Sequence, residues 1–263
     1  PKPSSAASDV YKRQLQAAAH LLNRAAFGGS PEEIQKLHAL GHAAAVRSLL
    51  HAGEDEDLFP APEIEPMKIQ RLKNDSMTPA ELAERRKIMN VQAREQTHEA
   101  RLWWIQRMAS TSYPAREKCV LFWHGHWATS IQKVQDPFLL LQQNQTLRAH
   151  ALGAFAPFAK EMSKDPAMIR YLDLNSSKVG YPNENFAREF MELFTLGEGH
   201  YSEEDIHEAA RAFTGYRINP KTGGFLFSPK NHDAGAKKIF GKSGAFDGDA
   251  TVDLIVSRPQ CAE

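Results

Sequence analysis

Cysteine is scarce in this sequence: there are two, Cys119 and Cys261, and neither lies in a CxxC or other metal-binding pattern. The sequence therefore predicts neither a disulfide framework nor a cysteine-based zinc site. Apolar runs of about 18 residues are also missing, so no transmembrane segment is expected. Basic and acidic residues balance at 32 each, which leaves no overall charge to attract nucleic acid.

Both ends of the sequence lack the signals of natural termini. The first 14 residues, PKPSSAASDVYKRQ, contain no initiator methionine and no apolar core of a secretion signal. We expect residues 1–14 to be a non-native or disordered tail. The other end, ATVDLIVSRPQCAE, stops within a predicted helix and has no cap after it. We therefore expect residues 15–263 to be a single α-helical domain that is truncated at its C-terminus.

Helix start signals are frequent and predict a mainly α protein. SPEE at 30–33 and TPAE at 78–81 are capping boxes, and the second opens a long helix that runs to about Ala109. Alternating segments on both sides of PKTGG predict a β-hairpin near 216–228. The expected fold is an irregular multi-helix array with this one β excursion. Further N-caps before apolar runs are predicted at Asp136, Asp165 and Asn183.

The stretch WHGHW at 123–127 places two histidines one residue apart between two tryptophans. On an unbroken helix His124 and His126 would point about 200° apart, but Gly125 can end a helix and let both rings turn inward. A pair at this spacing indicates a metal site. A histidine beside tryptophans also occurs as a hydrogen-bonded core residue, so both interpretations stay open.

The segment PNENFAREFMELFTLGEGHY at 182–201 predicts a strongly amphipathic helix. Glu184, Arg188 and Glu192 are spaced four residues apart on its polar side, which is typical of a solvated row of ion pairs. In the alternative interpretation the polar side lines a cleft. Arg188 then binds an anionic group, and Glu184 or Glu189 transfers protons.

Two further patterns carry chemistry-bearing residues. The pairs Glu95–His98 and Glu204–His207 have the spacing found in di-iron carboxylate bundles, although polar helices also produce it by chance. The loop NHDAGAKKIFGKSG at 231–244 places His232 and Asp233 beside flexible glycines, where side chains can be aimed at a ligand. A solvated turn is the competing interpretation of this loop.

Six blocks of the sequence resemble one known family. They are HLLNRAAFGGSPEEI, REKCVLFWHGHWATS, QNQTLRAHALGAFAPF, KDPAMIRYLDLNSSKVGYPNENFAREFMELFTLGEGHYSEEDI, EAARAFTGYRI and NHDAGAKKIFGKSGAFDGD. Together they resemble the bacterial family called domain of unknown function 1800 (DUF1800), from about residue 18 onward. The resemblance implies a longer, mostly helical protein that is frequently exported or periplasmic, and it implies no settled activity.

The resemblance extends to most of the residues discussed above and also to Arg211 and Lys237. It departs at His207, where the family typically has arginine, and this weakens the di-iron interpretation. Three polar motifs are the histidine pair at 124 and 126, the helix start at Asn183 and the loop with His232 and Asp233. If they meet in space, they form one shared site. The chain is similar to the family pattern at His124, His126, Asn183, Glu184, Arg188, Glu189, Glu192, Arg211, His232, Asp233 and Lys237.

The first functional hypothesis is an exported metal-dependent hydrolase. A divalent metal would activate water, a carboxylate would accept the proton, and an arginine would bind an anionic substrate group. The candidate metal ligands are His124, His126, His232 and Asp233. The candidate catalytic residues are Glu184, Arg188 and Glu189, and the candidate binding residues are Asn183, Glu192, Arg211 and Lys237.

The second hypothesis is a non-catalytic helical binding or assembly module, with a protein or polymer partner outside the cytoplasm. The same polar residues would then form a buried network that fixes how the helices pack. Pairing of His232 or Asp233 with lysines or with Arg188 is the structural feature that would favour this hypothesis.

Overall fold

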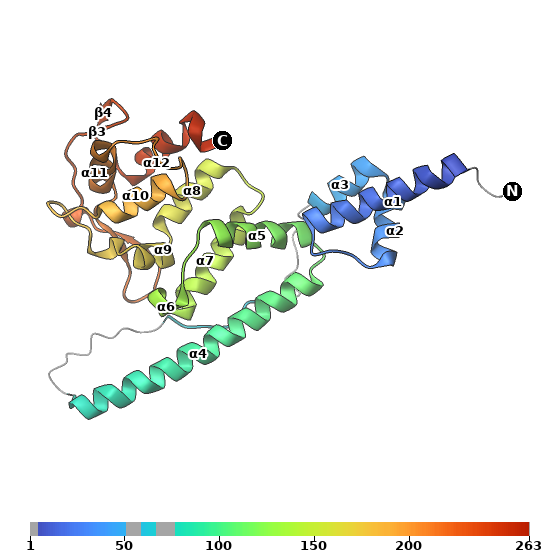
Figure 1. The fold of residues 1–263 in the computed structure, drawn as a ribbon. Helices are drawn as coiled ribbons and strands as arrows, with labels where there is room; N and C mark the ends of the chain where they lie inside the picture. The colour runs from blue at the N-terminus through green and yellow to red at the C-terminus, as the bar shows by residue number, and fades with distance from the viewer. Residues whose placement is uncertain (1–4, 51–58, 67–76, 263) are drawn as a thin grey trace. The chain divides into compact units, whose positions relative to one another are not determined.

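The computed structural model describes residues 5–50, 59–66 and 77–262 of the chain. The described residues are mainly α-helical, with two short antiparallel sheets, which confirms the predicted fold class (Figure 1). They divide into a first unit, residues 1–62 and 99–122, and a second unit, residues 63–98 and 123–263. No helix among the described residues is both long and apolar enough to cross a membrane.

The predicted tail falls partly within the described residues. Residues 1–4 lie outside them, and residues 5–14 belong to the first helix. That this segment is foreign to the native protein, and that a single truncated domain follows it, both stay predictions.

The first unit contains three helices near the N-terminus, together with residues 99–122. The predicted capping box is present, since Ser30 Oγ accepts the Glu33 N–H at 3.2 Å and the Glu33 carboxylate accepts the Ser30 N–H at 2.7 Å. The apolar faces of the three helices meet in a buried cluster that contains Leu22, Leu37 and Leu49. The helices are α1 (Ser5–Ala25), α2 (Pro31–Leu40) and α3 (His42–Leu50).

Two further helices each contribute residues to both units, α4 (Pro79–Ser110) and α5 (Pro114–His126). Within the first unit, Arg107 Nε of α4 lies 2.9 Å from Glu117 Oε1 of α5, and both side chains are buried. Trp104 Nε1 donates to the same carboxylate. The start and end of α4 agree with the helix predicted from TPAE to about Ala109.

The second unit contains the remaining elements. The N-caps predicted at Asp136, Asp165 and Asn183 are all present. Its α-helices are α6 (Ile131–Val134), α7 (Pro137–His150), α8 (Phe155–Lys164), α9 (Pro166–Tyr171), α10 (Glu184–Glu192), α11 (Glu203–Ala212) and α12 (Gly248–Val256). Its 3-10 helices are η2 (Leu174–Ser176), η3 (Pro229–Asn231) and η4 (Pro259–Ala262). Its strands are β1 (Tyr216–Ile218), β2 (Phe225–Phe227), β3 (Lys237–Ile239) and β4 (Lys242–Gly244).

The strands form two hairpins. β1 and β2 make the predicted one, with Tyr216 opposite Phe227. β3 and β4 make a second hairpin, with Lys237 opposite Gly244, which the sequence did not predict. Its two-residue turn has positive φ at both Phe240 (49°) and Gly241 (75°), as a type I′ turn requires. Phenylalanine is a rare first residue in such a turn, so the usual Asn-Gly signal is absent.

Aromatic side chains fill the core of the second unit. Trp127 stacks on Phe194 with ring centroids 4.8 Å apart, and Phe186 meets Phe213 edge-on at 5.0 Å. Phe190 lies between these pairs, in contact with both Trp127 and Phe213. Each such ring buried on folding contributes roughly 1.5–3 kcal/mol. The apolar face of α10 is therefore committed to the core, and its polar face is left to meet α11.

Candidate functional site

Asn183, a predicted binding residue, is fully engaged at the start of α10. Its Oδ1 accepts the Phe186 N–H at 3.4 Å, and its Nδ2 donates to the Leu172 carbonyl at 2.9 Å. Its own backbone N–H donates to Ser177 Oγ at 3.0 Å. Both halves of the side-chain amide are therefore used in fixing the helix start.

The charged side chains of α10 pair with other segments rather than with one another. Arg188 makes a two-pronged ion pair with Glu203, at 2.8 and 2.7 Å, and Glu203 is largely exposed. Glu192 accepts a hydrogen bond from the Tyr201 hydroxyl. The predicted row of ion pairs along α10 is thus replaced by contacts to the segment that follows it. Exposed pairs of this kind are screened by water and salt and contribute little to stability.

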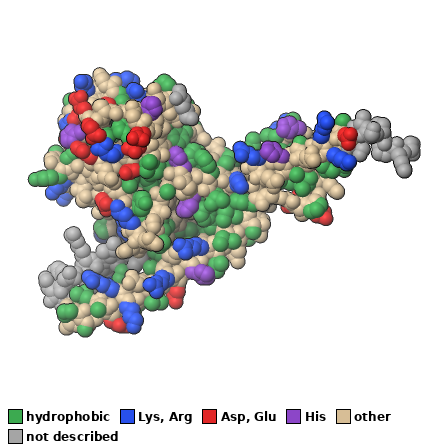
Figure 2. Space-filling model, viewed as in Figure 1, with side chains coloured by type: hydrophobic (Ala, Val, Ile, Leu, Met, Phe, Trp, Pro, Cys, Tyr) green, Lys and Arg blue, Asp and Glu red, His purple; other side chains and the backbone are tan. Residues whose placement is uncertain are grey.

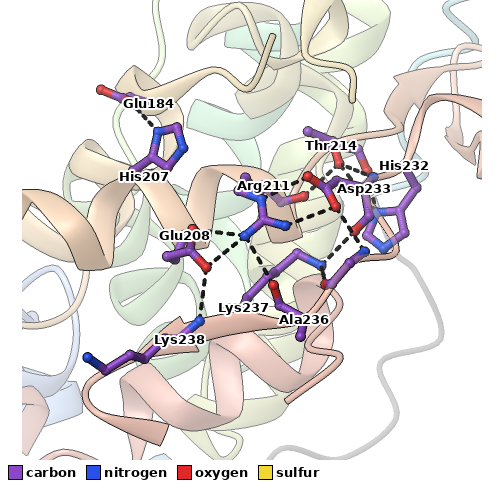
Figure 3. A network of polar contacts seen from close by, with 11 residues as sticks. Glu184, His207, Glu208, Arg211, Thr214, His232, Asp233, Ala236, Lys237 and Lys238 are labelled. Carbon is purple, nitrogen blue, oxygen red and sulfur yellow. Dashed lines mark hydrogen bonds and ion pairs between the residues drawn. The ribbon is translucent and has the colours of Figure 1, made fainter. Parts of the chain in front are cut away.

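Glu184 and His207 form a second link between α10 and α11. The Nδ1 atom of His207 lies 2.8 Å from Glu184 Oε1, and each side chain is about half exposed. Figure 3 shows this pair apart from the other labelled polar contacts. The pair engages one candidate catalytic residue, Glu184. Its partner, His207, is the residue at which the sequence departs from the family pattern.

The polar face of α11 holds the β3–β4 hairpin. Asp205 accepts the Phe240 N–H at 2.6 Å, and Glu208 accepts the Lys238 N–H at 2.9 Å. One helical turn further on, Arg211 Nη1 donates to the Ala236 carbonyl at 3.1 Å. Residues three apart on one helix face therefore satisfy backbone groups of β3 and of the residues directly before and after it, as a neighbouring strand would.

Arg211 is the centre of this arrangement (Figure 3). Its Nε and Nη2 donate to the two carboxylate oxygens of Asp233, at 2.8 and 3.2 Å, and its Nη1 donates to Glu208 at 2.8 Å. The hydrogen bonds from Arg211 hold the pKa of Asp233 below its usual value. The group formed by Asp205, Glu208, Arg211, Asp233, Lys237 and the β3 backbone is called the α11 network below.

Lys237 is the buried lysine of the α11 network. It is only 2% exposed, and its Nζ donates to the backbone carbonyls of Asp233 at 2.6 Å and Gly235 at 3.0 Å. Burial lowers the pKa of this lysine. A residue predicted to bind a ligand is therefore turned inward, where it fixes the loop before β3.

Thr214 and His232 connect the α11 network to the chain around Gly215. Thr214 Oγ1 donates to the Arg211 carbonyl at 2.6 Å and accepts the Asp233 N–H at 2.8 Å. His232 Nδ1 donates to the Thr214 carbonyl at 2.9 Å, which leaves its Nε2 as the nitrogen able to accept a proton. Gly215 has φ +85°, and a side chain there would lie 2.7 Å from the Ser228 carbonyl.

The histidines of WHGHW lie in an unbroken helix. α5 continues through Gly125 to His126, so the helix end that would turn both rings inward is not present. His126 Nε2 donates to the Phe194 carbonyl at 3.0 Å, and its ring meets the edges of Trp123 and Trp127. Burial lowers the pKa of His124, which favours its neutral form.

These contacts decide which predicted site residues lie together. The structure joins Arg211, Asp233 and Lys237 directly, with His232 beside them through Thr214. The described residues contain no group of three or more histidine, cysteine, aspartate or glutamate side chains placed to hold a metal ion. The assignment of metal ligands and catalytic residues stays a prediction. Glu208, Thr214 and Asp205 were missed, because their partners lie on segments distant in the sequence.

A cleft of about 1090 Å³ lies in the second unit, beside the β1–β2 hairpin. Residues of η2, β1 and η3 line it, among them Asn175, Arg217 and Lys230. It is called the β1 cleft below. None of the predicted site residues is among its described lining residues. No motif pointed to it, because its lining comes from short segments spread along the sequence.

Comparison with known proteins identifies a family. The model of a protein family of unknown function, DUF1800, matches residues 20–263. No curated protein and no solved structure matches the chain.

Proposed function

The chain belongs to the DUF1800 family, and we propose that it is a non-catalytic helical binding module in which the α11 network has a structural role. The observation that carries the proposal is the engagement of both oxygens of Asp233 by Arg211. The guanidinium takes one acceptor position on each oxygen, the Gly235 N–H takes a second position on Oδ1, and Arg211 lowers the pKa of the carboxyl, so Asp233 is a weak proton acceptor and a poor metal ligand in this arrangement. Lys237 is likewise engaged, since its ammonium is bonded to two carbonyls.

The location of the predicted residues supports this role. The α11 network ties a helix to a three-residue strand, β3, whose one strand neighbour among the described residues is β4. Such a short hairpin is marginal alone and needs packing against another element. Side chains that accept and donate along β3 supply that contact. Three of the predicted site residues, Arg211, Asp233 and Lys237, are thus used in holding the hairpin in place.

The competing function is an exported metal-dependent hydrolase. One observation favours it: His232 donates through Nδ1 to a backbone carbonyl, which is the usual way in which a protein orients a histidine whose other nitrogen binds a metal. His126 is oriented similarly, by the Phe194 carbonyl. Bound metal with His232 as a ligand would therefore support the hydrolase.

Melting of the metal-stripped and zinc-loaded full chain distinguishes the two functions. A metal that binds only the folded state raises stability by mass action. Because the proposed module does not bind metal, we expect its melting temperature to stay within about 1 °C after zinc is added. We expect Asp233→Asn to lower it by roughly 2–6 °C, which corresponds to a loss of about 1–1.5 kcal/mol in a chain of this size.

The matched control is Asp253→Asn, which removes a carboxylate that pairs with Lys160 at an exposed position. It should leave the melting temperature nearly unchanged. A rise in melting temperature on zinc loading that is abolished in His232→Ala would contradict the structural role and support the hydrolase.

A further inference from the structure

The β1 cleft contains two cations that have no carboxylate partner among the described residues, Arg217 of β1 and Lys230 of η3. They differ in setting, since Arg217 is half-buried and Lys230 is exposed. A half-buried cation without a counter-ion is costly unless something else compensates its charge. The cleft thus has a positive charge that the described part of the chain does not neutralise.

The other charges at the β1 cleft are compensated. Arg170 Nη1 lies 3.2 Å from Asp136 Oδ2, at a carboxylate that is almost fully buried. Asp173 is paired with Lys133, whose Nζ lies 2.8 Å from its Oδ2. Neither acidic side chain is therefore left over to neutralise a third cation.

The backbone fixes the guanidinium of Arg217. Its Nη1 donates to the Tyr216 carbonyl at 3.1 Å and to the Leu174 carbonyl at 3.5 Å. Nε and Nη2 make no hydrogen bond with the described residues. Burial lowers the pKa of Arg217, as expected for a cation partly removed from water without an anion beside it. A guanidinium held in this way is preorganised for an oxyanion, which it can bind with two parallel N–H groups.

Two asparagines add further donors to the β1 cleft. Asn175 Oδ1 accepts the Ile218 N–H at 2.9 Å, and Asn219 Oδ1 accepts the Lys221 N–H at 2.9 Å. In each case the oxygen of the amide is engaged, and the NH₂ half makes no hydrogen bond with the described residues. The unused groups of these four side chains are therefore all donors, which suit a ligand rich in acceptor oxygens.

We propose that the β1 cleft binds a small organic ligand through a phosphate or carboxylate group. The volume of about 1090 Å³ is far larger than a single ion and falls at the upper end of organic ligand sites. Arg217 binds the oxyanion directly, and Lys230 attracts it from the rim. The inference gives the binding module proposed above a class of ligand, and it rests on that proposal.

Calorimetric titration of the full chain with three compounds that share one ring tests the proposal: glucose 6-phosphate, glucuronate and glucose. We expect one or both of the charged compounds to bind and glucose not to. Arg217→Gln should weaken this binding roughly tenfold or more, and Lys230→Gln less, since the second cation is exposed. Arg217→Lys keeps the charge but loses the two-pronged geometry, and it should fall between wild type and Arg217→Gln.

The matched control is Lys242→Gln, which removes an exposed lysine of β4 that does not line the β1 cleft. Its affinity should equal that of the wild type. The proposal is overturned if neither charged compound binds, if glucose binds as tightly, or if Lys242→Gln weakens binding as much as Arg217→Gln. Release of inorganic phosphate from bound glucose 6-phosphate would instead contradict the non-catalytic function and leave the oxyanion site standing.

Discussion

The α11 network and the β1 cleft contain two arginines only six residues apart in the sequence, Arg211 and Arg217, in opposite electrostatic settings. Arg211 is held by two carboxylates, Glu208 and Asp233, and its partners are themselves bonded to the backbone. Arg217 is held only by carbonyls. The comparison teaches that a charged residue indicates a binding site when it lacks a partner of opposite charge, and that its residue type alone is a weaker indication. On the face shown in Figure 2, acidic and basic side chains intermingle over the α10–α11 region, as expected for a surface whose charges are mutually compensated.

The largest effect we expect separates the two arginines by stability. Arg211→Met leaves two carboxylates without their partner and should lower the free energy of unfolding by about 3 kcal/mol. Arg217→Met removes only hydrogen bonds to carbonyls and should cost about 1 kcal/mol or less. Urea unfolding of the full chain at pH 7 measures both. Equal losses in the two variants would remove the distinction between the α11 network and the β1 cleft.

A smaller effect is expected at Gly215, where the two regions meet. Gly215→Ala introduces a side chain at φ +85° that lies 2.7 Å from the Ser228 carbonyl and 3.2 Å from His232. We expect a loss of about 2 kcal/mol, from backbone strain and from displacement of His232. Gly241→Ala is the matched control, since its φ is +75° but nothing lies within 4 Å. If both variants lose the same amount in urea unfolding, the close approach at Gly215 contributes nothing.

The smallest effect concerns acid. The pKa of Asp233 in the folded chain lies below its ordinary value of 3.8, because Arg211 stabilises the ionised form. Its contribution to stability is therefore complete above about pH 4 and is lost as the pH falls through the lowered pKa. Asp233→Asn should differ from wild type by about 1 kcal/mol at pH 7 and by progressively less below pH 4. A difference that stays constant down to pH 2 would show that the Asp233–Arg211 pair does not act through charge.

The sequence predicted the helices well because their signals are local. Capping boxes and N-caps lie within four residues of the groups they satisfy, so Ser30, Asp136, Asp165 and Asn183 could be assigned without tertiary information. The β1–β2 hairpin was visible for the same reason, through its alternation and its glycines. The β3–β4 hairpin was not, since its strands have three residues each and its turn begins with Phe240.

The sequence could not predict how the candidate site residues are arranged. Arg211, His232, Asp233 and Lys237 do lie together, yet the sequence could not show that they satisfy one another. The partner of Arg188 was sought along α10 and is Glu203, fifteen positions away at the start of α11. The β1 cleft could not be predicted from the sequence. Whether a charged side chain has a counter-ion depends on which residues lie near it in the folded chain, and not on its neighbours in the sequence.

The partners of Arg211 also fix an order in time. Glu208 lies three residues before it on the same helix, whereas Asp233 and Ala236 lie 22 and 25 residues after it. During synthesis α11 therefore leaves the ribosome before the hairpin, and of the contacts of Arg211 with Glu208, Asp233 and Ala236 only the one with Glu208 can form at that stage. The α11 side of the contacts that later hold β3 can therefore be present before the hairpin is made. The hairpin, which is the last part of the α11 network to be synthesised, then packs against a helix that has already formed.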